Sequence, residues 1–141
     1  MLDDAHPDVP ARLAIVTGRL NRRLRSASGQ LSHGLLSALA TISKQGPLRL
    51  AELAQLESVS APSTTRLVAE LESKGLVSRE PDPADGRAVL LSITLKGEAA
   101  VAAARAARAE MVAELFETLD TGEISAIAAA VPALEKAIER F

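Results

Sequence analysis

Turn-forming residues divide the middle of the chain into short pieces, and their positions limit the fold more than any other feature of the sequence. Gly46-Pro47 ends one helical pattern, because proline cannot continue a helix. Lys74-Gly75 closes a later one, since glycine supplies the left-handed backbone that often follows a helix. Two stretches with strand character, over 76–80 and 87–94, then flank a segment with two prolines and a glycine. The spacing predicts short helices followed by a β-hairpin with a long loop over 81–86.

Two short helices are expected between these breaks, over 50–57 and from Ala61 to the Lys74-Gly75 stop. Ser60 is placed to cap the second of them, and Pro62 is tolerated in its first turn. Side chains in both helices recur at the spacing of a single helical face. The residues expected to point into the core are Leu50, Leu53 and Leu56 in the first helix, and Thr64, Leu67, Val68 and Leu71 in the second.

Longer helices are expected on both sides of this unit. Leu13, Val16, Leu20 and Leu24 follow a near-heptad spacing in the first. The predicted ranges are 9–27, from a Ser32 cap to Gly46, 96–119, and 122–140, the last kinked or broken at Pro132. The fold class is therefore mostly α with a small β-wing, a winged helix-turn-helix flanked by helices. The expected divisions are 1–30, 31–95 and 96–141.

Composition excludes several classes of protein. Aromatic residues make up 1% of the chain, so the core must be aliphatic. The absence of cysteine excludes a disulfide scaffold, a thiolate zinc site and a cysteine redox sensor, and it fits a cytoplasmic protein. Two histidines, His6 and His33, without a dense carboxylate cluster argue against a metal site. No apolar run approaches the roughly 20 residues of a membrane span, and the polar N-terminus does not resemble a signal peptide.

Charge is segregated along the chain, although the net charge is only −2. The segment 9–51 contains seven basic residues and no acidic one. Such a segment can form a basic surface for a polyanion. The alternative is that these arginines simply lie on solvated helix faces.

The start of the helix that follows Ser60 is the first candidate for function. With its apolar face turned inward, the opposite face carries small or basic side chains: Pro62, Ser63, Arg66 and Ala69, flanked by Ser60 and Thr65. Such a helix tip can enter a DNA major groove, where hydroxyl and guanidinium groups reach bases or phosphates. The alternative is an ordinary capped helix start. A helix-helix-hairpin order favours the DNA-binding interpretation.

The hairpin loop is the second candidate. Pro81 and Pro83 stiffen its backbone, and Asp85 can pair with the guanidinium of Arg87 to direct it. A stiff loop loses less entropy on binding, so an arginine on it is suited to a narrow, negative minor groove. The alternative is a surface hairpin closed by an ordinary Asp–Arg pair.

The sequence resembles the MarR family of bacterial winged-helix transcriptional regulators along nearly its whole length. The most specific motif is Asp-Pro-x-Asp-x-Arg at 82–87, which follows Lys-Gly-Leu-Val at 74–77. The other residues that carry the resemblance are Leu53-Ala54, Val59 to Val68, Leu71 to Ser73, Arg79 to Pro81, Leu91 to Thr94 and Lys96-Gly97.

This resemblance implies a regulator, expected to be a repressor, that binds a pseudo-palindromic double-stranded DNA operator as a homodimer. It makes 1–30 and 96–141 dimerisation helices and 31–95 the DNA-binding domain. The long apolar first helix and the Ala-rich segment after Glu98 support dimerisation independently, since a compact winged unit cannot bury them. The implied DNA-binding residues are Ser60, Pro62, Ser63, Thr65 and Arg66 of the recognition helix, the wing pair Asp85 and Arg87, and Arg79, which either contacts phosphate or forms a structural pair.

The resemblance also implies release from DNA by a small anionic or phenolic effector. Four basic side chains are candidates to bind it: Arg19, Arg22, Arg23 and His33. The alternative is that the arginines are solvated or face phosphates and that His33 is an ordinary histidine on a helix surface. The lack of aromatic residues leaves no stacking wall for a planar ligand.

The sequence also bears on two other classes of function. An enzyme would need a nucleophile with its base, or a metal or phosphate-binding loop, and the sequence shows none of these, so no catalytic residue and no cofactor are expected. A winged-helix protein-interaction module without DNA binding is the stronger alternative. Between residues 60 and 90 there are four basic and five acidic residues, which would suit such a module.

Overall fold

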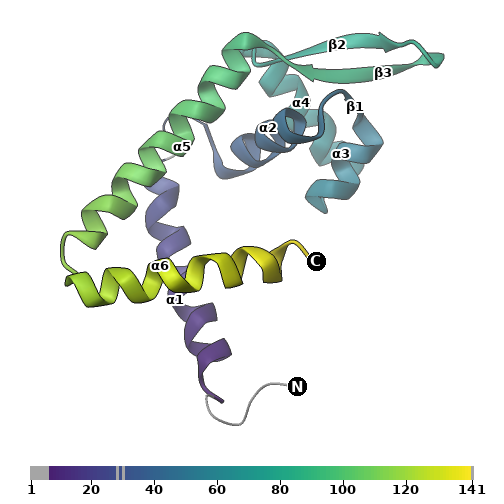
Figure 1. The fold of residues 1–141 in the computed structure, drawn as a ribbon. Coiled ribbons are helices and arrows are strands. Elements are labelled where there is room, and N and C mark those ends of the chain that lie inside the picture. The colour runs from purple at the N-terminus through teal and green to yellow at the C-terminus, as the bar shows by residue number, and fades with distance from the viewer. Residues whose placement is uncertain (1–6, 28, 30, 141) are drawn as a thin grey trace.

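The computed structural model describes residues 7–27, 29 and 31–140, and Figure 1 shows their arrangement. The chain is mostly helical with one small antiparallel sheet, as the sequence predicts. The elements in chain order are α1 (Val9–Ser26), α2 (His33–Gln45), β1 (Leu48–Arg49), α3 (Leu50–Glu57), α4 (Ala61–Ser73), β2 (Val77–Asp82), β3 (Asp85–Ile93), α5 (Leu95–Phe116) and α6 (Thr121–Ile138).

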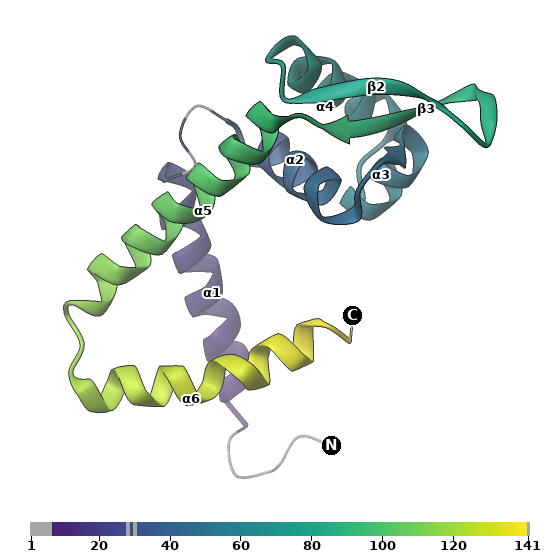
Figure 2. The same cartoon turned by 45° about the horizontal axis from the view of Figure 1, so that its top comes forward.

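The core lies between α2, α3, α4 and the sheet, and the start of α5 closes it. Figure 2 shows the strands of the sheet lying across these helices. Leu39, Leu53 and Leu71 are completely covered, one from each of the three helices. The core is aliphatic throughout, as the aromatic content requires. Its members are Leu35, Ala38, Leu39, Ile42, Leu48, Leu53, Val68, Leu71, Leu76, Val77, Leu91 and Val101.

Local capping explains where the helices begin and end. The Ser32 hydroxyl oxygen accepts a hydrogen bond from the Leu35 amide at 3.3 Å, and α2 stops at Gly46, whose φ is +75°. Asp120 and Glu123 form a reciprocal capping box at the start of α6. Gly75, with φ of +72°, follows the end of α4. The predicted helix boundaries at these positions are confirmed.

The sheet differs from the predicted hairpin in two ways. Its order is β1-β3-β2, and β1, which the sequence did not reveal, pairs Leu48 with Leu91. The long loop predicted over 81–86 is wrong. The strands continue through it, Pro81 lies opposite Val89, and only Pro83-Ala84 make the turn. Proline is tolerated because β2 is an edge strand with an irregular register near Asp82.

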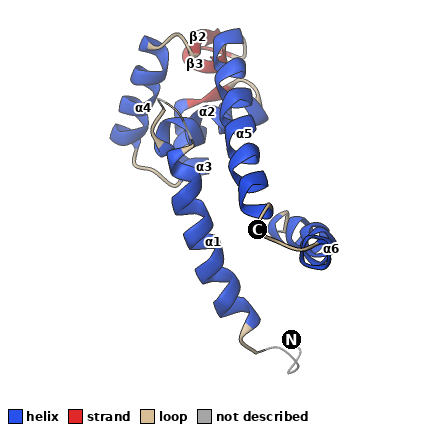
Figure 3. Cartoon of the chain, turned by 90° about the vertical axis from the view of Figure 1, so that its left-hand side faces the viewer, coloured by secondary structure: helices blue, strands red, loops and turns tan. Residues whose placement is uncertain are grey.

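We call the unit formed by α2, α3, α4, the sheet and the start of α5 the lobe. The helices α1 and α6 and the rest of α5 extend away from it. Figures 1 and 2 show α5 leading from the lobe to α6, and Figure 3 shows α6 standing apart from α1. Neither α1 nor α6 has a buried residue among those described. In the first helix, Leu13 and Val16 are exposed, and Leu20 and Leu24 are only half-buried.

Helices α6 and α3 each differ in one respect from the predicted pattern. Helix α6 continues through Pro132, so the break considered there does not occur. Leu56 was expected in the core, but it is 53% exposed. The eight residues of α3 make only two turns, and these bring Leu53 fully into the core and Leu50 partly.

Candidate nucleic-acid interface

The N-terminal tip of α4 presents the side chains that the sequence singled out. Thr64 is 1% exposed, and its hydroxyl donates to the Ser60 carbonyl oxygen at 3.0 Å, which fixes the first turn against the core. The opposite face is open to solvent. Pro62, Thr65 and Arg66 are exposed there, and Ser63 is half-buried.

Hydrogen bonds within the tip hold its hydroxyl groups in place. The Ser60 oxygen accepts from the Ser63 amide at 3.4 Å, while its hydroxyl donates to the Ser63 oxygen at 3.0 Å. The Thr65 hydroxyl donates to the Ala61 carbonyl oxygen at 2.9 Å. Arg66, by contrast, forms no salt bridge with any described residue. Its guanidinium is therefore the group at this tip best able to reach an external anion.

The wing carries Arg87 near its end, on β3, with an exposed side chain. The predicted pairing of Asp85 with the Arg87 guanidinium is not what the structure shows. Asp85 Oδ1 instead accepts from the backbone amide of Arg87 at 3.1 Å. Carboxylates in tight turns commonly bond an amide two residues ahead, and this leaves the Arg87 guanidinium without a salt bridge in the described chain.

An ion pair that the sequence did not reveal joins the wing to the helix-turn-helix. The Arg49 guanidinium donates to Asp82 Oδ2 through Nε at 3.0 Å and Nη2 at 2.6 Å. The second carboxylate oxygen, Oδ1, accepts from the Ala84 amide at 2.9 Å. Asp82 is only 8% exposed. The Ala84 amide and the Arg49 guanidinium lower the pKa of Asp82 despite the opposing effect of burial, and Asp82 raises the pKa of Arg49.

Arg79 occupies the position beside the wing for which two roles were open. Its Nε lies 2.9 Å from Glu72 Oε2, so the side chain ties β2 to α4. Glu70 on the same helix lies 3.8 Å from the Lys74 ammonium. The structure therefore supports the structural pair for Arg79, and it also shows where two carboxylates of this region are engaged.

The four candidate effector residues do not share one cavity. His33 lines a cavity of about 400 Å³ between α2 and α5, together with Lys44, Arg105 and Arg108. Arg23 lies at a different hollow, beside Glu114. Arg19 and Arg22 are on the exposed surface of α1. The sequence analysis missed Arg105 and Arg108, although their three-residue spacing places them on one side of a helix.

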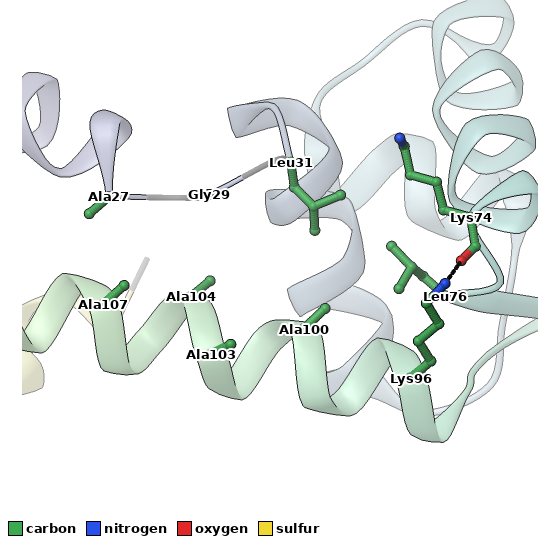
Figure 4. Close-up of a pocket in the computed structure, with 10 residues that line it drawn as sticks. All are labelled: Ala27, Gly29, Leu31, Lys74, Leu76, Lys96, Ala100, Ala103, Ala104 and Ala107. Carbon is green, nitrogen blue, oxygen red and sulfur yellow. Dashed lines mark hydrogen bonds between the residues drawn. The ribbon is translucent and has the colours of Figure 1, made fainter.

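A second cavity, of about 490 Å³, lies where the α1–α2 connection passes α5 (Figure 4). Ala100, Ala103, Ala104 and Ala107 form one wall, and Lys74 and Lys96 lie at one end. The Lys96 ammonium donates to the Lys74 carbonyl oxygen at 2.8 Å, which joins α5 to the end of α4. This cavity is mainly apolar, whereas the first one is lined with basic side chains.

Two other kinds of site receive no support from the described residues. No group of three or more histidines, aspartates or glutamates among them could hold a metal ion, and His6 lies outside the described range. None of the helices in the described ranges has the length and apolar character needed to cross a membrane.

Comparisons with known proteins agree with this geometry. Residues 31–89 match the family model described as the MarR family. An uncharacterised HTH-type transcriptional regulator of Mycobacterium bovis is 39% identical over 122 residues, which cover 85% of each chain. The solved structure of a transcriptional regulator of Thermotoga maritima is 26% identical, with a TM-score of 0.75 over 92% of this chain and 96% of that one. A mutant of MepR from S. aureus, bound to an oligodeoxyribonucleotide, is 19% identical, with a TM-score of 0.70 over 92% of this chain and 96% of its own.

Proposed function

This chain belongs to the MarR family of helix-turn-helix transcriptional regulators, and we propose that it represses transcription by binding a pseudo-palindromic DNA operator as a homodimer. The observation that carries the proposal is the pair of exposed guanidinium groups, Arg66 on α4 and Arg87 on the wing. Both are free of salt bridges within the described residues, and both project from one packed lobe. The DNA-bound MepR structure, which has the same fold, supports this use of the lobe.

In the proposed complex the tip of α4 enters the major groove. Ser60, Pro62, Ser63 and Thr65 are small enough to allow close approach, and Arg66 contacts a guanine or a phosphate. Arg87 enters the neighbouring minor groove, whose negative potential attracts a guanidinium. Arg79 and Asp85 serve this arrangement indirectly, by holding β2 against α4 and by ordering the backbone beside Arg87.

The ion pairs weaken the case for a protein-interaction module without DNA binding. That alternative rested on the acidic residues around the wing. Glu70, Glu72 and Asp82 are each paired with a basic side chain of the same lobe, whereas Arg66 and Arg87 are not paired. Glu80 and Asp85 form no salt bridge with any described residue either, so the unpaired charges of the segment 60–90 balance. At the tip of α4, however, the unpaired charge is that of Arg66, which is positive and favours DNA.

The proposed dimer rests on the exposed apolar face of α6 together with that of α1. Alternating steps of three and four residues separate the exposed side chains of α6, which is the spacing of a coiled-coil seam. They are Ile124, Ile127, Val131, Leu134 and Ile138. Helix α1 exposes Val9, Leu13 and Val16. A second copy would cover both faces, which makes 1–30 and 96–141 the dimerisation segments and 31–95 the DNA-binding segment. Two-fold pairing would place the two recognition helices roughly 34 Å apart, one turn of DNA.

The basic cavity between α2 and α5 is the proposed effector site. His33, Lys44, Arg105 and Arg108 line it, which suits a small anion such as a carboxylate or phenolate. The cavity lies between the DNA-binding lobe and the helix that leads to α6. An anion bound there would shift the two parts relative to each other and so release the operator. Arg19, Arg22 and Arg23 have no place in this site as the structure shows it.

Selection of duplexes from a random-sequence pool, followed by titration at several salt concentrations, tests DNA binding. The selected duplex should bind more tightly than its scrambled version, with an affinity that falls as salt rises. Arg87→Ala should weaken binding by roughly 10- to 100-fold. Arg140→Ala, which removes an equal charge beyond the end of α6, should leave binding unchanged. Equal affinity for selected and scrambled duplexes, with a salt slope near zero, would refute the proposal.

A further inference from the structure

We propose that Arg49 is a positioning residue for DNA recognition: through Asp82 it holds the outer part of the wing in the orientation that Arg87 needs. The inference rests on the proposed DNA binding and adds a residue that lies outside both the recognition helix and the wing. Arg49 ends β1 and immediately precedes α3. It therefore belongs to the helix-turn-helix, while its partner Asp82 is the last residue of β2, beside the turn of the wing.

The outer wing has little else to hold it to the lobe. Beyond the pairing of Arg49 with Leu90, β2 and β3 continue as two strands without β1. A two-stranded ribbon alone is only marginally stable in water. Figure 2 shows this ribbon projecting beyond α3. The two prolines stiffen the backbone locally, but they do not fix the direction of the ribbon relative to the recognition helix.

The Asp82 carboxylate joins Arg49 to the turn of the wing. Its Oδ2 accepts both guanidinium hydrogen bonds from Arg49, and its Oδ1 accepts the Ala84 amide within the turn. On the other side, the Arg49 amide donates to Glu52 Oε2 at 2.6 Å, in the first turn of α3. One continuous set of bonds thus runs from α3 to the wing turn. Asp85, the register partner of Asp82, then orders the Arg87 backbone.

A direct role for Arg49 is the competing explanation, because its side chain is 45% exposed and could contact a phosphate. The two roles predict different behaviour. Loss of a phosphate contact reduces the slope of log affinity against log salt concentration by about one unit. This reduction should be the same with Arg87 present and in the Arg87→Ala background. Loss of a positioning residue leaves the salt slope unchanged, and its cost depends on the presence of Arg87.

The test is a double-mutant cycle on the full-length protein with the selected duplex, using Arg49→Gln, Arg87→Ala and the double variant. We expect Arg49→Gln to weaken binding roughly three- to tenfold when Arg87 is present, since the wing must then be ordered on binding. In the Arg87→Ala background its cost should be less than about twofold. Asp82→Asn should reproduce the effect, and Arg49→Lys should partly restore binding.

Amide hydrogen exchange of the free protein gives a second readout that does not need DNA. Exchange over 82–87 should accelerate in Arg49→Gln and in Asp82→Asn, while α4 stays protected. Equal costs in both backgrounds, a salt slope lower by one unit, or unchanged exchange in the wing would each overturn the inference. If the wild-type protein fails to select any duplex, the proposed function fails, and the exchange measurement alone still decides whether Arg49 fixes the wing.

Discussion

Gly97 is the residue at which the smallest chemical change should have the largest effect on stability. It lies in the first turn of α5, where a Cβ would collide with the Leu76 carbonyl oxygen and lie 2.7 Å from Ile93 Cγ1. A backbone oxygen cannot move aside as a flexible side chain does. We therefore expect Gly97→Ala to lower the free energy of unfolding by about 1–3 kcal/mol, measured by urea denaturation.

Gly34→Ala is the matched control for this substitution. Gly34 also lies in the first turn of a helix, but the nearest atom to its added Cβ would be Leu67 Cδ2 at 3.6 Å, an ordinary contact. Alanine should leave stability unchanged or raise it by up to about 1 kcal/mol, because glycine loses more backbone entropy on folding. Equal losses from the two substitutions would contradict the close packing at Gly97.

Asp82 should make the stability of the fold depend on pH in the acid range. Its pKa in the folded state is lowered, first by the Ala84 amide and then by Arg49, from an ordinary value of 3.8. The carboxylate therefore stabilises the folded state above that ordinary value, and the contribution is lost as the pH falls through the lowered pKa. We expect wild-type and Asp82→Asn proteins to differ in urea denaturation at neutral pH and to converge as the pH drops below about 4. A difference that stays constant with pH would argue against the pair.

At the scale of helices and strands, signals local in sequence predicted local structure. Ser32 and Ser60 cap the helices that they were expected to cap, and Gly75 follows α4 with a positive φ. The two-residue strand β1 could not be predicted in this way. Nothing in Leu48-Arg49 itself has strand character, and the strand exists because Leu90 and Leu91 supply its partner.

In the candidate site, too, features set by local spacing were predicted, and contacts between distant parts of the sequence were not. Helical spacing placed Thr64 and Val68 in the core, and so it placed Pro62 and Arg66 outside. The contacts that hold the wing join residues far apart in sequence, such as Arg49 and Asp82. Asp85 and Arg87 are close in sequence, but a carboxylate in a tight turn reaches the nearby amide more readily than the end of a long side chain.

The cap of α4 allows helix stability to be separated from DNA contact. Ser60→Ala removes the oxygen that accepts the Ser63 amide and should cost about 1 kcal/mol of stability. Ser60→Asp keeps an acceptor and should retain that stability. Its carboxylate would face phosphates, however, so operator binding should weaken more than in Ser60→Ala. Thermal denaturation and duplex titration of both variants measure the two effects. Comparable binding by the two variants would place Ser60 away from the DNA.

The two parts of the molecule differ in how far they bury their apolar side chains. The lobe buries its core leucines within one chain, whereas α6 leaves its regularly spaced apolar side chains exposed. Aliphatic faces of this length normally pack against another helix. Figure 3 shows α6 lying apart from α1, and none of the residues of α6 is buried by the described part of the chain. The proposed two-fold partner would complete the structure and also match a palindromic operator.

Ile127→Lys tests whether a partner subunit covers α6, because it puts a charge in the middle of the apolar face of this helix. Ile127 is 37% exposed in the single chain. If a partner covers that face, the buried ammonium should raise the dimer dissociation constant roughly 100-fold or more. Leu95→Lys makes a similar change at a side chain that is 91% exposed. It should leave the dimer intact.

Light scattering and sedimentation over a range of concentrations distinguish the variants, and duplex titration then links assembly to function. A monomeric Ile127→Lys protein keeps its α4 tip and wing, but it loses the gain from binding two half-sites at once. Its affinity for the full operator should fall to that for a single half-site. A wild-type monomer at micromolar concentration, or an Ile127→Lys protein that still dimerises, would show that these faces do not form the proposed interface.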